Sequence, residues 1–196
     1  MDRLDRMLAL AHDRVPGLRL VHKRDVPWMR ALAVALRPIN PTFATEYTTV
    51  IGRTIYLPDG AAPTPRDRLA ITLAHELVHM LDMAEHGISF YATYLVAPAP
   101  FMRTKRAYWE RRGYAVDLLI AREAGGPAAV RRTERWLAGI FSGPAYGWMW
   151  AGRGAAAEYL RPTVESVLDG SIDRTEPYRS ILAAWRGSQP DTPEFA

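Results

Sequence analysis

Hydrophobic and polar residues recur with a helical period between residues 66 and 86. At about 100° per residue, small and aliphatic side chains fall on one broad face, which consists of Ala70, Leu73, Ala74, Leu77, Val78, Leu81 and Ala84. The opposite seam is polar and consists of Thr72, His75, His79, Asp82 and His86. Pro65 suits the start of such a helix and Gly87 suits its end. The pattern predicts an amphipathic helix whose apolar face lies in the core and whose polar seam faces a cleft.

The sequence before this helix predicts two further helices and a small sheet. Residues 2–14 and 28–36 have a helical pattern, whereas residues 18–22 alternate like a half-buried strand. β-Branched and aromatic residues dominate residues 42–57, which predict a β-hairpin that turns near Gly52. A short linker then leads from the second arm of the hairpin into the long amphipathic helix.

The sequence after Gly87 is mainly helical in pattern. Residues 88–100 are rich in aromatic residues and proline, and they predict a loop or short extended piece that caps the site. Residues 102–124 return to helical periodicity and end at Gly125-Gly126-Pro127. Further helices are expected at residues 127–141, 153–169 and 176–186, followed by a flexible tail at residues 188–196. The expected fold class is α+β: a small mixed or antiparallel sheet with a hairpin packed on the 66–86 helix, then a mostly helical C-terminal part.

The polar seam carries a His-Glu-x-x-His motif, His75-Glu76-Leu77-Val78-His79. The four-residue spacing puts both imidazoles on one helix face, one turn apart, where they can share a zinc ion. Glu76 lies about 100° further round, close enough to act as general base toward a water on the metal without being a ligand. Two ordinary surface histidines are the alternative, but the helical phase, the apolar backing and the preceding strand favour the metal site.

A catalytic zinc ion needs a third protein ligand and one open position. Glu85 stands at the spacing of the third ligand of metzincins, but that arrangement needs a glycine where this chain has Asp82. His86 is in phase with His75 but about 16 Å further along the helix, too far to share an ion. Neither residue is therefore favoured.

Glu110, in the 102–124 helix, is the favoured third ligand because a helix–loop–helix return can bring it back to the motif. It shares a helix face with Tyr114 and Asp117. Carboxylates on such a face need partners, and a metal ion is one that suits. Asp117, Glu85 and Asp82 stay open as alternative ligands.

These residues resemble a zincin metallopeptidase of the gluzincin-like type. The chain is most similar to small predicted zinc peptidases of bacteria and phages, in which a His-Glu-Leu-x-His helix precedes a later Glu-x-x-x-Tyr. The matching segments are residues 75–79 and Glu110-Arg111-Arg112-Gly113-Tyr114, and the resemblance covers about residues 45–120. It implies a zincin-like core in residues 1–125, which includes the third-ligand helix, and a helical extension in residues 126–187 packed on that core.

The resemblance also implies a function, hydrolysis of peptide bonds in a peptide or protein substrate by a Zn²⁺-activated water. His75, His79 and Glu110 would hold the metal, with Glu76 as general base. Tyr114 is a catalytic candidate as donor to the developing oxyanion. Asp82 and Asp117 are candidate acceptors for the imidazole N–H groups behind the metal. Tyr56, at the sheet edge, is a candidate substrate-binding residue, although a strand aromatic also suits core packing.

Composition narrows these expectations. The chain has no cysteine, so any metal must be held by His, Asp or Glu. The net charge of +4 is not gathered into a basic run, and a nucleic-acid partner is therefore not expected. The N-terminus lacks the apolar core of a signal peptide, and no stretch reaches the ~18 apolar residues of a membrane span. A cytoplasmic protein without membrane association is expected, with export or incorporation into a virion left open.

Two other roles fit the same residues. An inactive zincin scaffold with a stabilising zinc ion would serve in assembly, for instance of a phage-like particle. The Trp/Tyr-rich segment of residues 146–150 would then be a surface for a protein partner, although core packing is its alternative. A regulatory peptidase that acts on a DNA-bound repressor is the third hypothesis, in which the basic charge aids localisation.

Overall fold

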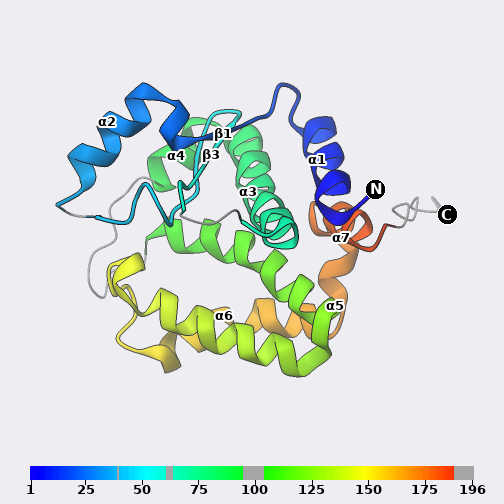
Figure 1. Cartoon of the computed structure of the whole chain (residues 1–196). Coiled ribbons are helices and arrows are strands. Elements are labelled where there is room, and N and C mark those ends of the chain that lie inside the picture. Colours follow the sequence, from blue (N-terminus) through cyan, green and yellow to red (C-terminus); the bar gives the residue numbers. More distant parts are fainter. Residues whose placement is uncertain (39, 61–63, 95–103, 188–196) are drawn as a thin grey trace.

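The computed structural model describes residues 1–38, 40–60, 64–94 and 104–187. Its helices are α1 (Arg3–Arg14), α2 (Pro27–Leu36), α3 (Arg66–His86), α4 (Ile88–Tyr94), α5 (Lys105–Phe141), α6 (Arg153–Leu168) and α7 (Tyr178–Arg186). Its strands are β1 (Arg19–His22), β2 (Thr49–Ile51) and β3 (Thr54–Leu57), and short 3₁₀ turns are η1 (Lys23–Asp25), η2 (Pro144–Tyr146) and η3 (Ser171–Arg174). The predicted α+β class is confirmed: a mostly helical chain carries one small sheet (Figure 1).

The sheet is mixed and has the strand order β1-β3-β2. β3 pairs in parallel with β1, with Thr54 opposite Arg19, and pairs antiparallel with β2 through the tight turn at Gly52. The first hairpin arm begins at Thr49, so the prediction of a strand from residue 42 was wrong. Residues 42–46 form turns instead, and the buried ammonium of Lys23 donates to the carbonyls of Phe43 (2.6 Å) and Tyr47 (2.7 Å). These two hydrogen bonds tie the segment to Lys23 instead of to a neighbouring strand.

The loop expected directly after Gly87 is a helix as far as it is described. α4 buries Phe90, whose ring stacks on that of Tyr94 at 5.2 Å. The indole N–H of Trp109 donates to the Thr93 hydroxyl at 3.0 Å, which joins α4 to α5. The rest of the predicted loop, residues 95–100, lies outside the described residues.

α5 consists of two helices that meet at a sharp kink. Gly125 and Gly126 leave helical geometry, and Gly126 has a φ of 62°, a conformation that favours glycine. The two halves run in opposite directions (Figure 1), and Tyr114 in the first half contacts the rings of Trp136 and Phe141 in the second. The predicted pair of helices on either side of Gly125-Gly126-Pro127 is thus confirmed. α6 packs along this helical hairpin.

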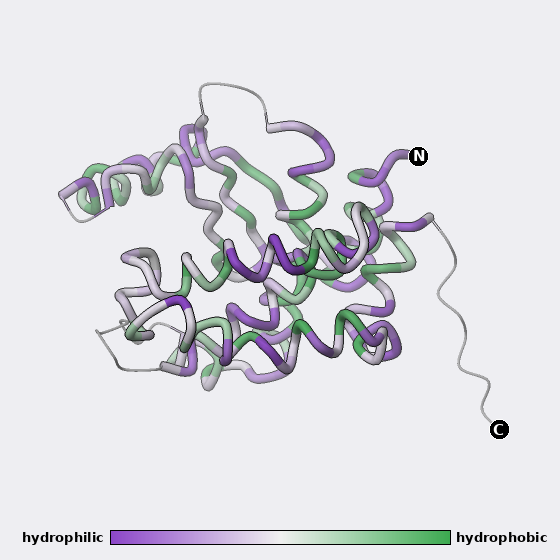
Figure 2. Tube along the Cα trace, turned by 90° about the horizontal axis from the view of Figure 1, so that it is seen from below, coloured by the Kyte–Doolittle hydropathy of each residue, from purple (hydrophilic) through white to green (hydrophobic). Residues whose placement is uncertain are grey.

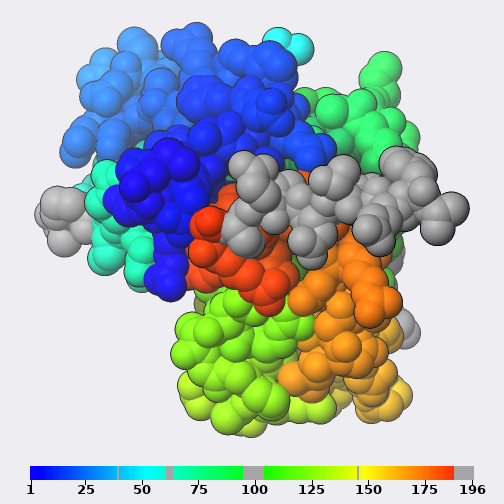
Figure 3. Space-filling view, turned by 90° about the vertical axis from the view of Figure 1, so that its right-hand side faces the viewer, coloured from blue at the N-terminus to red at the C-terminus, as the bar shows by residue number. Residues whose placement is uncertain are grey.

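One hydrophobic core runs from Leu4 in α1 to Trp185 in α7, so the parts before and after residue 125 share their apolar interior. Hydrophilic and hydrophobic residues alternate along the long helices, as expected of helices with one buried and one exposed face (Figure 2). α1 and α7 lie side by side (Figure 3), and the guanidinium of Arg6 donates to the carbonyls of Ala184 (2.6 Å) and Trp185 (2.9 Å). These two hydrogen bonds join α1 to α7.

The apolar face predicted for α3 is buried at Ala70, Leu73, Ala74, Leu77 and Val78. Most of the Trp/Tyr-rich segment is also in the core, since Tyr146, Met149 and Trp150 are buried whereas Trp148 is 52% exposed. Among the described residues, no helix is both long enough and apolar enough to cross a membrane.

Candidate metal centre

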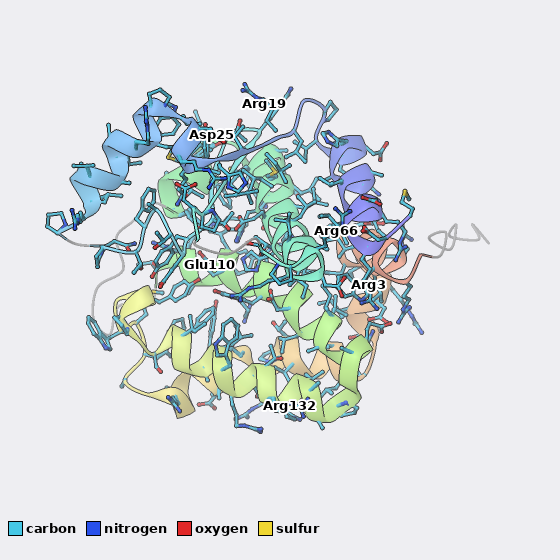
Figure 4. The ribbon with its side chains drawn as sticks, in the orientation of Figure 1. Arg3, Arg19, Asp25, Arg66, Glu110 and Arg132 are labelled. Carbon is cyan, nitrogen blue, oxygen red and sulfur yellow. The ribbon has the colours of Figure 1, made fainter. Side chains whose placement is uncertain are left out.

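Three side chains from two helices converge in the interior of the molecule. His75 and His79 come from α3 and Glu110 from α5, and one ligand atom of each lies within 4.8 Å of the others. The two Nε2 atoms are 3.2 Å apart, and Glu110 Oε2 is 3.9 Å from His75 Nε2 and 3.8 Å from His79 Nε2. Figure 4 shows Glu110 near the middle of the molecule. We call these three residues the candidate metal site.

The spacing of these atoms fits a metal ion. With zinc–ligand distances of about 2.0–2.2 Å and tetrahedral angles, ligand atoms lie about 3.3–3.6 Å apart. The nitrogen pair, 3.2 Å apart, is within about 0.1 Å of that range, and the carboxylate would need to move inward by only a few tenths of an ångström. Of the third-ligand candidates, the structure brings Glu110 to both histidines, whereas Glu85 is exposed and the His86 ring lies against Trp109 at 5.0 Å. The candidate metal site can therefore hold a metal ion.

Asp117 orients His75 from behind, as the sequence predicts. Its Oδ2 is 3.0 Å from His75 Nδ1, so in the neutral ring Nδ1 carries the proton and Nε2 is the nitrogen left for a metal ion. Burial alone lowers the pKa of His75, but the bond to Asp117 and the nearby Glu76 and Glu110 carboxylates raise that pKa to about 9. The metal-free site thus holds a proton that a metal ion must displace.

Glu110 is held as an anion. Its side chain is buried, and its Oε1 accepts a 2.6 Å hydrogen bond from the Tyr94 hydroxyl while Oε2 faces the histidines. Burial alone raises the pKa of Glu110, but His79, His75 and Tyr94 bring it well below its usual range. Tyr94 fixes one carboxylate oxygen and leaves the other for a metal.

Asp82 does not accept from an imidazole, which corrects the prediction. Both of its carboxylate oxygens lie 3.0 Å from Arg112 Nε, and Arg112 Nη2 is 2.8 Å from Oδ1. The carboxylate is 1% exposed, so it forms a buried ion pair between α3 and α5. His79 Nδ1 is buried and has no hydrogen-bond partner among the described residues. Asp82 lies on the helix face that was predicted, but its partner is Arg112 of α5 and not a histidine of α3.

Glu76 lies within the electrostatic reach of the centre without being one of its three ligands. Burial raises the pKa of Glu76, and the carboxylates of Glu110 and Asp117 raise it further, whereas His75 and His79 oppose them. In the described part of the chain its carboxylate makes no hydrogen bond or ion pair. A carboxylate that is free and less acidic than usual suits general base catalysis near neutral pH.

Tyr114 packs its ring edge-on against His75, with 4.7 Å between ring centroids. Its hydroxyl accepts a 3.3 Å hydrogen bond from the Tyr146 hydroxyl, which leaves the Tyr114 proton free for another acceptor. Burial raises the pKa of Tyr114, so the phenol stays protonated. The structure places the predicted donor beside a ligand of the candidate metal site.

Three neighbours of the site were not predicted: Tyr94, Tyr146 and Arg106. Arg106 Nε is 3.7 Å from Glu110 Oε1, and its guanidinium lies over the rings of Tyr94 and Tyr146. Arg106 precedes Glu110 by four residues, so helical spacing indicated their proximity. The positions of the tyrosines depend on α4 and η2, which no periodicity of α5 reveals.

Gly113 is where α5 comes closest to the motif. A Cβ atom on this residue would lie 2.6 Å from His75 Nε2, which real Cβ contacts do not allow. The glycine therefore gives the imidazole the space that it occupies.

Tyr56 lies on β3, the central strand, so the prediction that it stands at the sheet edge was wrong. It is 9% exposed, and its ring contacts that of Trp28 edge-on at 5.2 Å. No described contact joins it to the candidate metal site, so its substrate role stays a prediction while its packing role is visible.

Comparison of the chain with family models, with curated proteins and with solved structures gave no match.

Proposed function

We propose that this chain is a zinc-dependent metallopeptidase that hydrolyses peptide bonds in a peptide or protein substrate, and that its fold is zincin-like. The supporting observation is the convergence of His75, His79 and Glu110 within 4.8 Å beside the unpaired Glu76. Two imidazoles and one carboxylate form a ligand set that zinc takes in catalytic sites, where one position stays open. The same residues resemble the gluzincin-like motif pair, and the geometry supports that resemblance without depending on it.

A zinc ion held by these three side chains would lower the pKa of its bound water toward neutrality and would polarise a carbonyl group. Glu76 accepts the proton of the attacking water at its carboxylate and delivers that proton to the nitrogen of the leaving amine. Tyr114 would donate a hydrogen bond from its hydroxyl to the oxygen of the tetrahedral intermediate and keep its proton. Asp117 keeps the His75 Nδ1 proton in place, so that the ring does not turn or change tautomer.

A second function, a structural metal site on an inactive scaffold, is favoured by the burial of two of the ligands. His79 is 4% exposed and Glu110 5% exposed, and closed sites are typical of structural zinc. Such a site would need the same three ligands but not Glu76.

The substitution Glu76→Gln separates the two functions. For a peptidase, we expect wild-type zinc content, measured by mass spectrometry of the dialysed protein, and loss of at least about 10²-fold in cleavage rate of a quenched-fluorescence peptide library. His79→Ala is the control that should lose both the zinc and the cleavage. Equal activity of wild type and Glu76→Gln, or no cleavage by a zinc-loaded wild type, would overturn the peptidase proposal in favour of the structural one.

A further inference from the structure

A pocket of about 620 Å³ lies outside the candidate metal site, between the second half of α5 and the connection from η2 to α6. Its lining includes Arg135, Trp136, Gly139, Pro144 and Arg153. The guanidinium of Arg153 lies close to Gly139, where a Cβ atom would be 3.6 Å from Arg153 Nε. We call this feature the arginine pocket.

The arginine pocket has positive charge without a counterion from the chain. Both arginines are exposed, and neither side chain makes an ion pair or hydrogen bond within the described residues. No acidic residue lines the pocket. The nearest acid in sequence, Glu134, is already paired with Arg131 at 2.9 Å. Two unpaired guanidinium groups in one pocket suit a carboxylate, which they bind with charge-assisted hydrogen bonds.

Trp136 adds an apolar surface beside these charges. Its side chain is 55% exposed, although large aromatic residues are usually buried or engaged at interfaces. An exposed indole between two arginines can pack on the backbone or aliphatic part of a peptide while the arginines take its acidic group. The pocket therefore combines the contacts that a short acidic peptide needs.

Tyr114 links the arginine pocket to the candidate metal site. Its ring lies 6.2 Å from that of Trp136 on one side and 4.7 Å from that of His75 on the other, between centroids. The ring centroids of Trp136 and His75 are therefore at most about 11 Å apart, the sum of the two distances. An extended peptide covers that distance in about three residues. The two places are therefore close enough to contact one extended peptide.

We propose that the arginine pocket binds a carboxylate of the peptide substrate, about three residues from the bond that is cleaved. This inference rests on the proposed peptidase function, and it names acidic peptides as the substrate class. Single-stranded nucleic acid would also bring anions and stacking bases, but the neighbouring Arg131 and Arg161 are paired with Glu134 and Glu158, which lowers the positive charge that a phosphate backbone would follow on the described surface.

The binding test uses the full-length protein in chelator at about 0.15 M salt, where no catalysis takes place. Isothermal titration compares three hexapeptides of otherwise equal sequence: one with Glu and an amidated end, one with Gln and a free C-terminal carboxylate, and one with Gln and an amidated end. We expect only carboxylate-bearing peptides to bind, and the first two show whether the side chain or the chain end is recognised. Arg135→Gln/Arg153→Gln should weaken that binding about tenfold or more.

The matched control is Arg30→Gln/Arg37→Gln, which removes the same charge from exposed positions of α2 and its C-terminus and should leave binding unchanged. Equal binding of all three peptides, equal weakening by both double variants, or tighter binding of a dT₁₀ oligonucleotide that displaces the peptide would overturn the proposal.

A cleavage test with the zinc-loaded protein then separates this inference from the proposed function. We expect a Glu scan of one peptide to show fastest cleavage with the acid about three residues from the scissile bond. Cleavage without any preference for acidic residues would refute the arginine pocket but keep the peptidase. Binding of acidic peptides without cleavage would refute the peptidase and the role of the pocket in its substrate choice.

Discussion

Replacing Gly113 by alanine tests how closely α5 must approach the motif helix. The added Cβ would lie 2.6 Å from His75 Nε2, 2.8 Å from Cε1 and 2.9 Å from Cδ2, so it meets the whole edge of the imidazole. Ordinary contact begins at 3.4 Å, and the ring or the helix must therefore move by about 0.8 Å. His75 cannot retreat freely, because Asp117 holds its Nδ1 and the Tyr114 ring covers another side.

A shift of that size is large for a metal ligand. Metal–ligand distances hold within about 0.2 Å, so the displaced Nε2 would no longer sit at bonding distance without strain. Changes that misplace a ligand typically cost 10–100-fold in metal affinity, which corresponds to about 1.4–2.8 kcal/mol. Alanine also favours a helix over glycine by up to about 1 kcal/mol, which offsets part of the overpacking cost of about 1–3 kcal/mol, so the free energy of unfolding of the metal-free variant should fall by at most about 2 kcal/mol.

The assay is a zinc titration in competition with a chromophoric chelator, with unfolding in urea measured on the same samples. Gly154→Ala is the matched control, because a Cβ on this helical glycine of α6 meets nothing within 4 Å. We expect Gly113→Ala to bind zinc 10–100-fold more weakly than wild type and Gly154→Ala to bind it equally well. A folded Gly113→Ala protein with wild-type zinc affinity would refute the close approach of Gly113 to a metal ligand.

Three further predictions test the surroundings of the site. Asp117→Ala removes the acceptor of the His75 N–H and should weaken zinc binding about 10–100-fold in the same titration, whereas unchanged affinity would show that His75 needs no orienting partner. Arg112→Met leaves the Asp82 carboxylate buried and unpaired, so the free energy of unfolding should fall by about 3–5 kcal/mol in urea denaturation, and Asp82→Leu in the same protein should restore most of it. Hydrogen bonding to Arg186 lowers the pKa of Glu123, so this pair stabilises the fold above pH 4.5 and loses that contribution as the pH falls through the lowered pKa. In Arg186→Gln the urea midpoint should accordingly depend less on pH between 6 and 3, and an unchanged pH dependence would contradict the assignment.

Helical periodicity was sufficient for the parts of the site that lie on one helix. The spacing of His75 and His79 fixes their common face, and the same rule places Glu110, Tyr114 and Asp117 on one face of α5. We predicted that Glu110 returns to the histidines because a zinc site needs a third ligand and because a helix–loop–helix connection can bring α5 back along α3. For these residues, the spacing along the sequence was enough to predict which side chains share a helix face.

Periodicity failed where the partner belongs to another element. Asp82 points in the predicted direction, but the angle of a residue on a helical wheel does not reveal that Arg112 reaches it first. α4 is a helix although its segment was predicted as a loop or short extended piece, because Phe90 packs on Trp109 of α5 in addition to stacking on Tyr94 one turn later in α4. Such tertiary contacts override local preference.

The close approach of Gly113 to His75 also depends on a partner from another helix. In the sequence, Gly113 is a glycine within a predicted helix. Such a glycine either lowers the stability of the helix or leaves room for a neighbouring side chain, and the sequence does not distinguish the two. Only the relative placement of α3 and α5 shows that His75 fills the space.

Diffraction at the zinc absorption edge from crystals of the zinc-loaded protein tests the metal assignment most directly. We expect one anomalous peak per chain, about 2.0–2.2 Å from His75 Nε2, His79 Nε2 and a Glu110 carboxylate oxygen. A peak that lies elsewhere, or no peak from protein that binds zinc in solution, would contradict the assignment of His75, His79 and Glu110 as the metal ligands.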